Sequence, residues 1–85
     1  MTPEQEKAKE IVEKHYCIIE YATAGLFEED VDYVKARQTA AKACAIEEVK
    51  AVIDVIADLH IIADSEGIMK SMIYHEKLLT EIEKL

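Results

Sequence analysis

The three histidines of this chain, His15, His60 and His75, are its candidates for a metal site. With Glu76 or Cys17 as a fourth ligand, they could hold zinc in a tetrahedral site. The sequence contains no His-x-x-x-His or Cys-x-x-Cys pair, so each ligand distance would depend on packing between separate helices. We therefore treat the histidines as weak metal candidates, expect them to pack between helices, and expect no cofactor.

A short cationic stretch interrupts an otherwise acidic chain, whose formal net charge is −8. On a helix, Lys35, Gln38 and Lys42 share one side, and Tyr33 lies near Arg37 on another. Cationic and aromatic groups in this arrangement could bind an anion such as a nucleotide. The alternative is that these cations pair with nearby carboxylates, namely Glu20, Glu28, Glu29 or Asp30.

The sequence gives little indication of catalysis, nucleic-acid binding or cysteine chemistry. There is neither a local nucleophile–base arrangement nor a glycine-rich phosphate loop, so we do not expect an enzyme. The acidic balance argues against general nucleic-acid binding, which needs Lys and Arg at the phosphates. Cys17 and Cys44 lie among apolar residues, and we expect them to be small buried hydrophobes rather than disulfide partners.

The composition predicts a single all-α domain over residues 1–85. Of these residues 51% are apolar and 33% charged, while Gly and Pro number only 2 and 1. The longest apolar runs, near residues 51–56 and 59–63, are too short for a membrane span of about 20 residues. The first residues also lack the basic and apolar regions of a secretory signal, so we expect a cytoplasmic protein.

Three helices are expected, over about residues 3–24, 28–63 and 66–84. Thr2, Pro3 and Gln5 form a helix-start pattern, and Gly25 and Gly67 bound a run free of glycine and proline. The central helix would span roughly 50 Å, whereas a compact domain of this size has a radius of gyration near 12 Å. We therefore expect the helical hairpins to assemble into a homo-oligomeric bundle, a dimer or higher.

Two segments carry more apolar residues than one helical face can hold, and these segments indicate where the copies would meet. Glu48 lies within this apolar arc, where a carboxylate needs a partner such as Lys42, Arg37 or a residue of a second chain. An antiparallel dimer would bring residues 15–27 of one chain next to residues 49–62 of the other. The expected interface residues are Tyr16, Ile18, Tyr21, Glu48, Val52, Val55, Leu59 and Ile62.

Several segments resemble short uncharacterised proteins encoded by phages and prophages of Bacteroidetes bacteria. The resemblance covers both ends of the chain and the middle of the central helix. It is carried by Thr2-Pro3-Glu4-Gln5, Lys7-Ala8-Lys9-Glu10-Ile11-Val12, Ala41-Lys42-Ala43-Cys44-Ala45, Val49, Ile53, Tyr74 and Glu81-Ile82-Glu83-Lys84-Leu85.

The resemblance implies a small non-enzymatic accessory protein that acts in the cytoplasm of a bacterial host. Such a protein would bind a host component through its oligomer. It could inhibit host defence by binding a defence protein or by sequestering a cyclic-nucleotide signal. The alternatives are a purely structural assembly module and a metal-binding helical bundle.

Overall fold

The computed structural model contains three α-helices: α1 (Pro3–Ala22), α2 (Tyr33–Ile62) and α3 (Glu66–Lys84). It describes residues 1–25, 32–63 and 65–85, and no strand occurs among them. The all-α prediction is therefore confirmed. The oligomeric bundle stays a prediction.

Local hydrogen bonds explain where α1 begins and ends. The Thr2 hydroxyl accepts a hydrogen bond from the Gln5 backbone at 3.2 Å, and the Gln5 side chain accepts one from the Thr2 backbone at 3.0 Å. This capping box satisfies two of the otherwise unpaired amides of the first turn. The helix ends at Ala22, slightly before the expected residue 24, and Gly25 then adopts a left-handed φ of 78°.

Side-chain caps also define the starts of α2 and α3. The Asp32 carboxylate accepts a hydrogen bond from the Lys35 backbone at 3.1 Å, so α2 begins at Tyr33. The start expected near residue 28 lies outside the described residues. The Ser65 hydroxyl accepts from the Ile68 backbone at 3.2 Å and caps α3.

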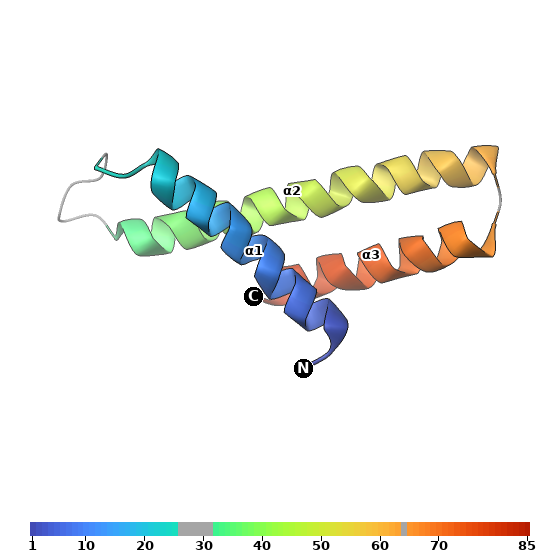
Figure 1. Cartoon of the computed structure of the whole chain (residues 1–85), viewed down its shortest axis with the longest axis horizontal. Helices are drawn as coiled ribbons and strands as arrows, with labels where there is room; N and C mark the ends of the chain where they lie inside the picture. Colours follow the sequence, from blue (N-terminus) through green and yellow to red (C-terminus); the bar gives the residue numbers. More distant parts are fainter. Residues whose placement is uncertain (26–31, 64) are drawn as a thin grey trace.

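The helices form an elongated molecule with one three-helix junction. In Figure 1, α2 and α3 run antiparallel as a hairpin, and α1 crosses them obliquely near the middle of α2 and the C-terminal end of α3. The principal extents are 53 × 27 × 15 Å, and the radius of gyration is 15.7 Å. This radius exceeds the roughly 12 Å of a compact chain of the same length.

The hydrophobic core lies at this junction, where each helix contributes two buried side chains. The junction residues are Ala8 and Ile11 from α1, Ala45 and Val49 from α2, and Leu78 and Ile82 from α3. The two alanines are fully buried and allow the helix backbones to approach closely. Away from the junction the described helices pack in pairs, so apolar side chains remain exposed there.

Candidate functional site

Arg37 of the predicted cationic cluster donates hydrogen bonds to Thr23, at the C-terminal end of α1. Its Nε donates to the Thr23 hydroxyl at 3.0 Å and its NH2 group donates to the Thr23 carbonyl at 3.3 Å. The side chain is 8% exposed and its guanidinium lies 4.9 Å from the centre of the Tyr33 ring. The last turn of α1 has no basic residue of its own, so Arg37 supplies the cation that a helix C-terminus favours.

Lys42 makes the corresponding contact with the end of α3. Its ammonium donates to the carbonyl oxygen of Glu83 at 2.7 Å. Lys35 and Gln38 are exposed on α2. The described contacts of Arg37 and Lys42 therefore go to carbonyl oxygens at the ends of two different helices, rather than to a shared anion site. Of the carboxylates expected as partners, Glu20 makes no described contact with them, and Glu28, Glu29 and Asp30 lie outside the described residues.

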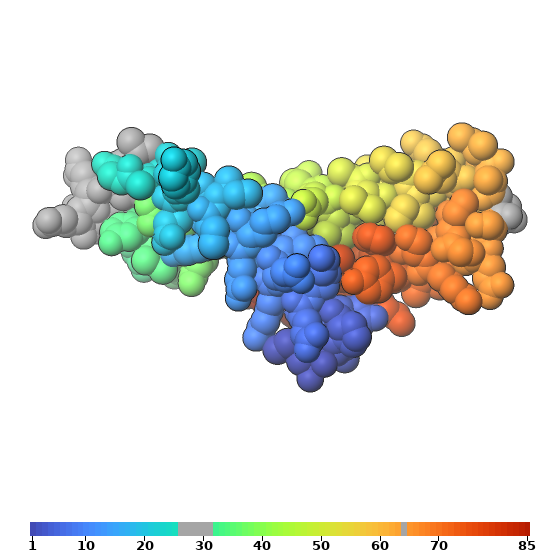
Figure 2. Space-filling model, viewed as in Figure 1, coloured from blue at the N-terminus to red at the C-terminus, as the bar shows by residue number. Residues whose placement is uncertain are grey.

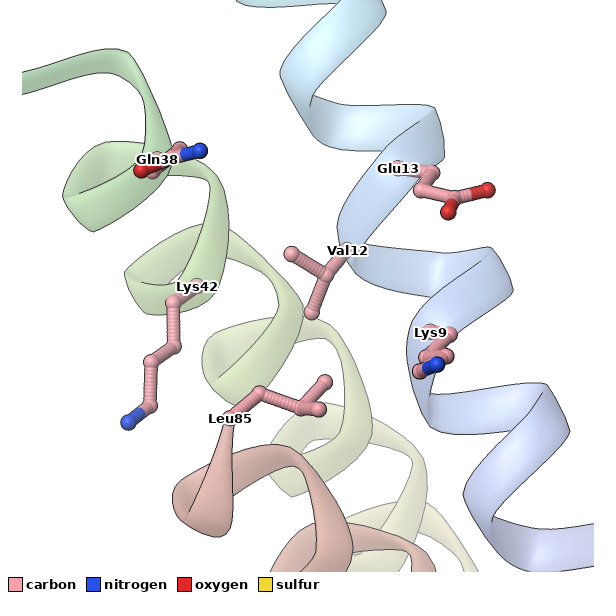
Figure 3. Close-up of a pocket in the computed structure, with 6 residues that line it drawn as sticks. All are labelled: Lys9, Val12, Glu13, Gln38, Lys42 and Leu85. Atoms are coloured by element: carbon pink, nitrogen blue, oxygen red, sulfur yellow. The ribbon is translucent and has the colours of Figure 1, made fainter. Parts of the chain in front are cut away.

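A pocket of about 340 Å³ lies where α1, the start of α2 and the chain end meet. Figure 3 shows Val12 and Leu85 pointing into the space between the helices, whereas the Lys42 ammonium and the Glu13 carboxylate point away from it. Gln38 and Lys9 complete the lining. The pocket therefore has an apolar floor, and its charged groups do not converge on one point.

Glu48 pairs with α1 of the same chain. Its Oε1 lies 2.7 Å from the Lys14 ammonium, and its Oε2 lies 3.7 Å from Nε2 of His15. The observed partners are Lys14 and His15 rather than the expected Lys42 or Arg37, because the oblique crossing brings α1 over this part of α2. The expected pairing with a residue of a second chain stays a prediction. The hydrogen bond from Lys14 lowers the pKa of Glu48 below its usual value, and partial burial opposes the shift.

We expect the Glu48→Gln substitution to destabilise the chain modestly, and only above acidic pH. The Glu48 pKa is lowered on folding, so its contribution is present above the unfolded value of about 4.5 and is lost as the pH falls through the folded value. The carboxyl is partly exposed, so the expected loss at pH 7 is below about 1 kcal/mol. Urea unfolding at pH 7 and at pH 3 measures this difference.

The neighbouring Glu47→Gln substitution is the matched control, because Glu47 is exposed on the same helix. A Glu48→Gln effect that persists undiminished at pH 3 would contradict the ion-pair explanation.

The three histidines occupy separate places. His15 is beside Glu48, His60 is in the last turn of α2, and Nδ1 of His75 donates to the Ser71 carbonyl at 2.7 Å. Within the described ranges, no three His, Cys, Asp or Glu side chains are grouped as a metal site requires. The metal-binding alternative therefore gains no support from the geometry.

Four expected interface residues form an exposed row on α2. Val52, Val55, Leu59 and Ile62 follow a 3-4-3 spacing, which places them on one face, and they are 38% to 81% exposed. We call this set the α2 row. Glu48, which contacts α1, lies one turn before Val52, so the row continues the α1-contacting face of α2. In Figure 2, the α1 atoms cover the middle of the molecule and leave the later part of α2 uncovered.

The predicted interface residues of α1 differ in their exposure to solvent. Ile18 is 57% and Tyr21 is 88% exposed, whereas Tyr16 is partly buried. Tyr16 lines a second pocket of about 350 Å³ together with Val12, Glu13, Cys17 and Gln38. Exposed apolar side chains thus occur on both helices that were expected to meet a second copy.

Both cysteines differ from the expectation of burial. Cys17 and Cys44 are free and exposed, on α1 and α2 respectively. Cys17 lies in the later part of α1, which packs against α2, and Cys44 directly precedes the fully buried Ala45 of the junction while its own side chain is exposed. The apolar neighbours that surround each cysteine in the sequence therefore do not enclose it in space. The sequence pattern alone could not show this.

Two further findings bear on what the chain is. None of the described helices combines the length and the apolar character needed to cross a bilayer. No protein family matches the chain, and neither a curated protein nor a solved structure matches it.

Proposed function

We propose that this chain is a small non-enzymatic binding protein that works as a homo-oligomer joined through the α2 row. The observation that carries the proposal is the row itself: Val52, Val55, Leu59 and Ile62 are apolar, exposed and aligned on one face. An apolar row with this spacing is the kind of surface that another helix covers in a bundle or coiled coil.

The contacts of the cationic cluster favour a protein partner over a nucleotide. A nucleotide-binding oligomer would need Arg37 and Lys42 to contact phosphate, but both donate to carbonyl oxygens of their own chain. The remaining cation of the cluster, Lys35, is exposed among small side chains, where a shallow pocket is lined by Asp32, Ala36, Thr39, Ala40 and Ala43. The nucleotide-sequestering form of the hypothesis is therefore the weaker one.

The resemblance to phage and prophage proteins supplies the biological setting of the proposal. In that setting the oligomer binds a host component, such as a defence protein, through surfaces that self-association leaves open. A purely structural assembly module is the alternative, and it shares the same self-association.

Sedimentation velocity at micromolar concentration tests the self-association, with two neighbouring isoleucines as a matched pair. Ile62 belongs to the α2 row and is 81% exposed, whereas Ile61 is 84% exposed and projects about 100° away. We expect Ile62→Glu to shift the protein toward monomer by burying an unpaired charge at the contact. Ile61→Glu should leave the wild-type oligomer intact.

Circular dichroism would establish that both variants keep their helices. A wild-type protein that sediments as a monomer across this range would overturn the proposal. Equal loss of association in both variants would show that the contact is not at the α2 row.

A further inference from the structure

We infer the register of the contact, and the inference rests on the proposed function: two chains pack antiparallel about a two-fold axis near Ala57. In this register Val55 lies against the partner's Leu59, and Val52 lies against the partner's Ile62. The two α2–α3 hairpins then form a four-helix bundle. This register differs from the dimer expected from the sequence, because residues 15–27 lie outside the contact and do not meet the partner's residues 49–62.

The spacing of the α2 row is suited to a two-fold contact. Val52 and Ile62 are equally far in sequence from residue 57, and so are Val55 and Leu59. In an isologous contact, residue i meets residue j while residue j meets residue i, which this symmetric spacing allows without any mismatch. Each pair joins a valine to a larger side chain, and the two-fold axis repeats both the Val55–Leu59 and the Val52–Ile62 contact once on each side.

The position of α1 selects the antiparallel orientation over the parallel one. Glu48 lies on the row-bearing face of α2 and is held to Lys14 of α1 at 2.7 Å, so α1 occupies this face one turn before the row begins. In a parallel pair both copies of α1 would lie at the same level of the interface and collide. In the antiparallel pair centred on residue 57, the two Glu48 levels are roughly 27 Å apart along the helices.

The exposed area of the chain matches the area that a dimer contact removes. The chain exposes 6032 Å², whereas a compact monomer of its mass, 9.6 kDa, is expected to expose about 5,100 Å². Two chains together therefore carry an excess of about 1,900 Å². Stable protein–protein contacts bury about 1,200–2,000 Å² in total.

Disulfide trapping tests the register in a background where Cys17 and Cys44, both exposed, are replaced by serine. The chains Val52→Cys and Ile62→Cys are oxidised separately and as an equimolar mixture. In the antiparallel register each new thiol is about 15 Å along the helix from its own copy, but directly opposite the other. We expect covalent dimer in the mixture, joining one chain of each kind, and none in either variant alone.

Ile61→Cys is the control, since its thiol lies off the row and should form no covalent dimer with itself or with either variant. Covalent dimers of Val52→Cys with itself would overturn the inference in favour of a parallel pair. An oligomer that forms no cross-link in the mixture would also overturn the register, while leaving the proposed function standing. A wild-type monomer in the sedimentation experiment would overturn both.

Discussion

Replacing Ile82 by alanine is expected to lower the free energy of unfolding by about 2–5 kcal/mol, the largest single effect among the substitutions considered. Ile82 is 0% exposed and packs in the junction, where all three helices meet. Its removal opens a cavity that each helix borders. A chain of 85 residues has roughly 4–13 kcal/mol of stability in total, so the loss is a large fraction of it.

Ile73→Ala on the same helix is the matched control. Ile73 is 47% exposed, so the same chemical change should cost less than about 1.5 kcal/mol there. Both values come from urea unfolding followed by circular dichroism at one fixed protein concentration, because self-association would add to the apparent stability. Similar losses in the two variants would contradict the placement of the core at the junction.

Enlarging Ala45 to leucine is expected to destabilise the fold by about 1–3 kcal/mol, because the larger side chain overpacks the core. Ala45 is fully buried, and with Ala8 of α1, also fully buried, it lies in the core where α1 crosses α2. A leucine there must push α1 away, which weakens the Lys14–Glu48 and Arg37–Thr23 contacts that join the two helices. Thermal and urea unfolding measure the loss.

Ala43→Leu supplies the comparison for this substitution. Ala43 is exposed on α2, two residues before Ala45, and a longer side chain there can extend into solvent. Leucine and alanine have similar helix propensities, so Ala43→Leu should change stability by less than about 0.5 kcal/mol. A large loss at Ala43 would show that the exposed side of α2 is covered by something that the single chain does not contain.

Much of the fold could be predicted from the sequence because helix starts are encoded locally. The capping box of Thr2 and Gln5 and the Ser65 cap both use side chains within three residues of the amides that they bond. The all-α class followed from composition in the same way. The beginning of α2 was harder, because acidic residues suitable for a first turn precede the Asp32 cap.

The functional meaning of the cationic stretch could not be read from the sequence. Arg37 contacts Thr23 and Lys42 contacts Glu83, which are 14 and 41 residues away. Whether a cation meets a ligand or a helix terminus depends on where α1 and α3 end in space. One local signal was present: α1 has no basic residue in its last turn, so its terminal carbonyls needed a donor from elsewhere.

The buried side of α2 was also only partly predictable. Its surface is apolar over a wide arc, so the helical pattern allows several positions for a neighbour. The oblique crossing of α1 buries Arg37 and Val49 and leaves Val52 and Leu59 exposed. A crossing angle depends on the small side chains at the contact, here Ala8 and Ala45, and it has no counterpart in the periodicity of one helix.

The position of the chain ends gives the molecule a direction. Thr2 and Leu85 both line pockets, and Figure 1 places the two chain ends near the middle of the long axis, whereas the end of α2 and the start of α3 lie together at one tip. Two copies joined through the α2 row would form a rod with one junction on each side of the contact. Such a rod is bivalent, so it would gain avidity only toward a target that presents two copies of its own binding surface at a matching separation.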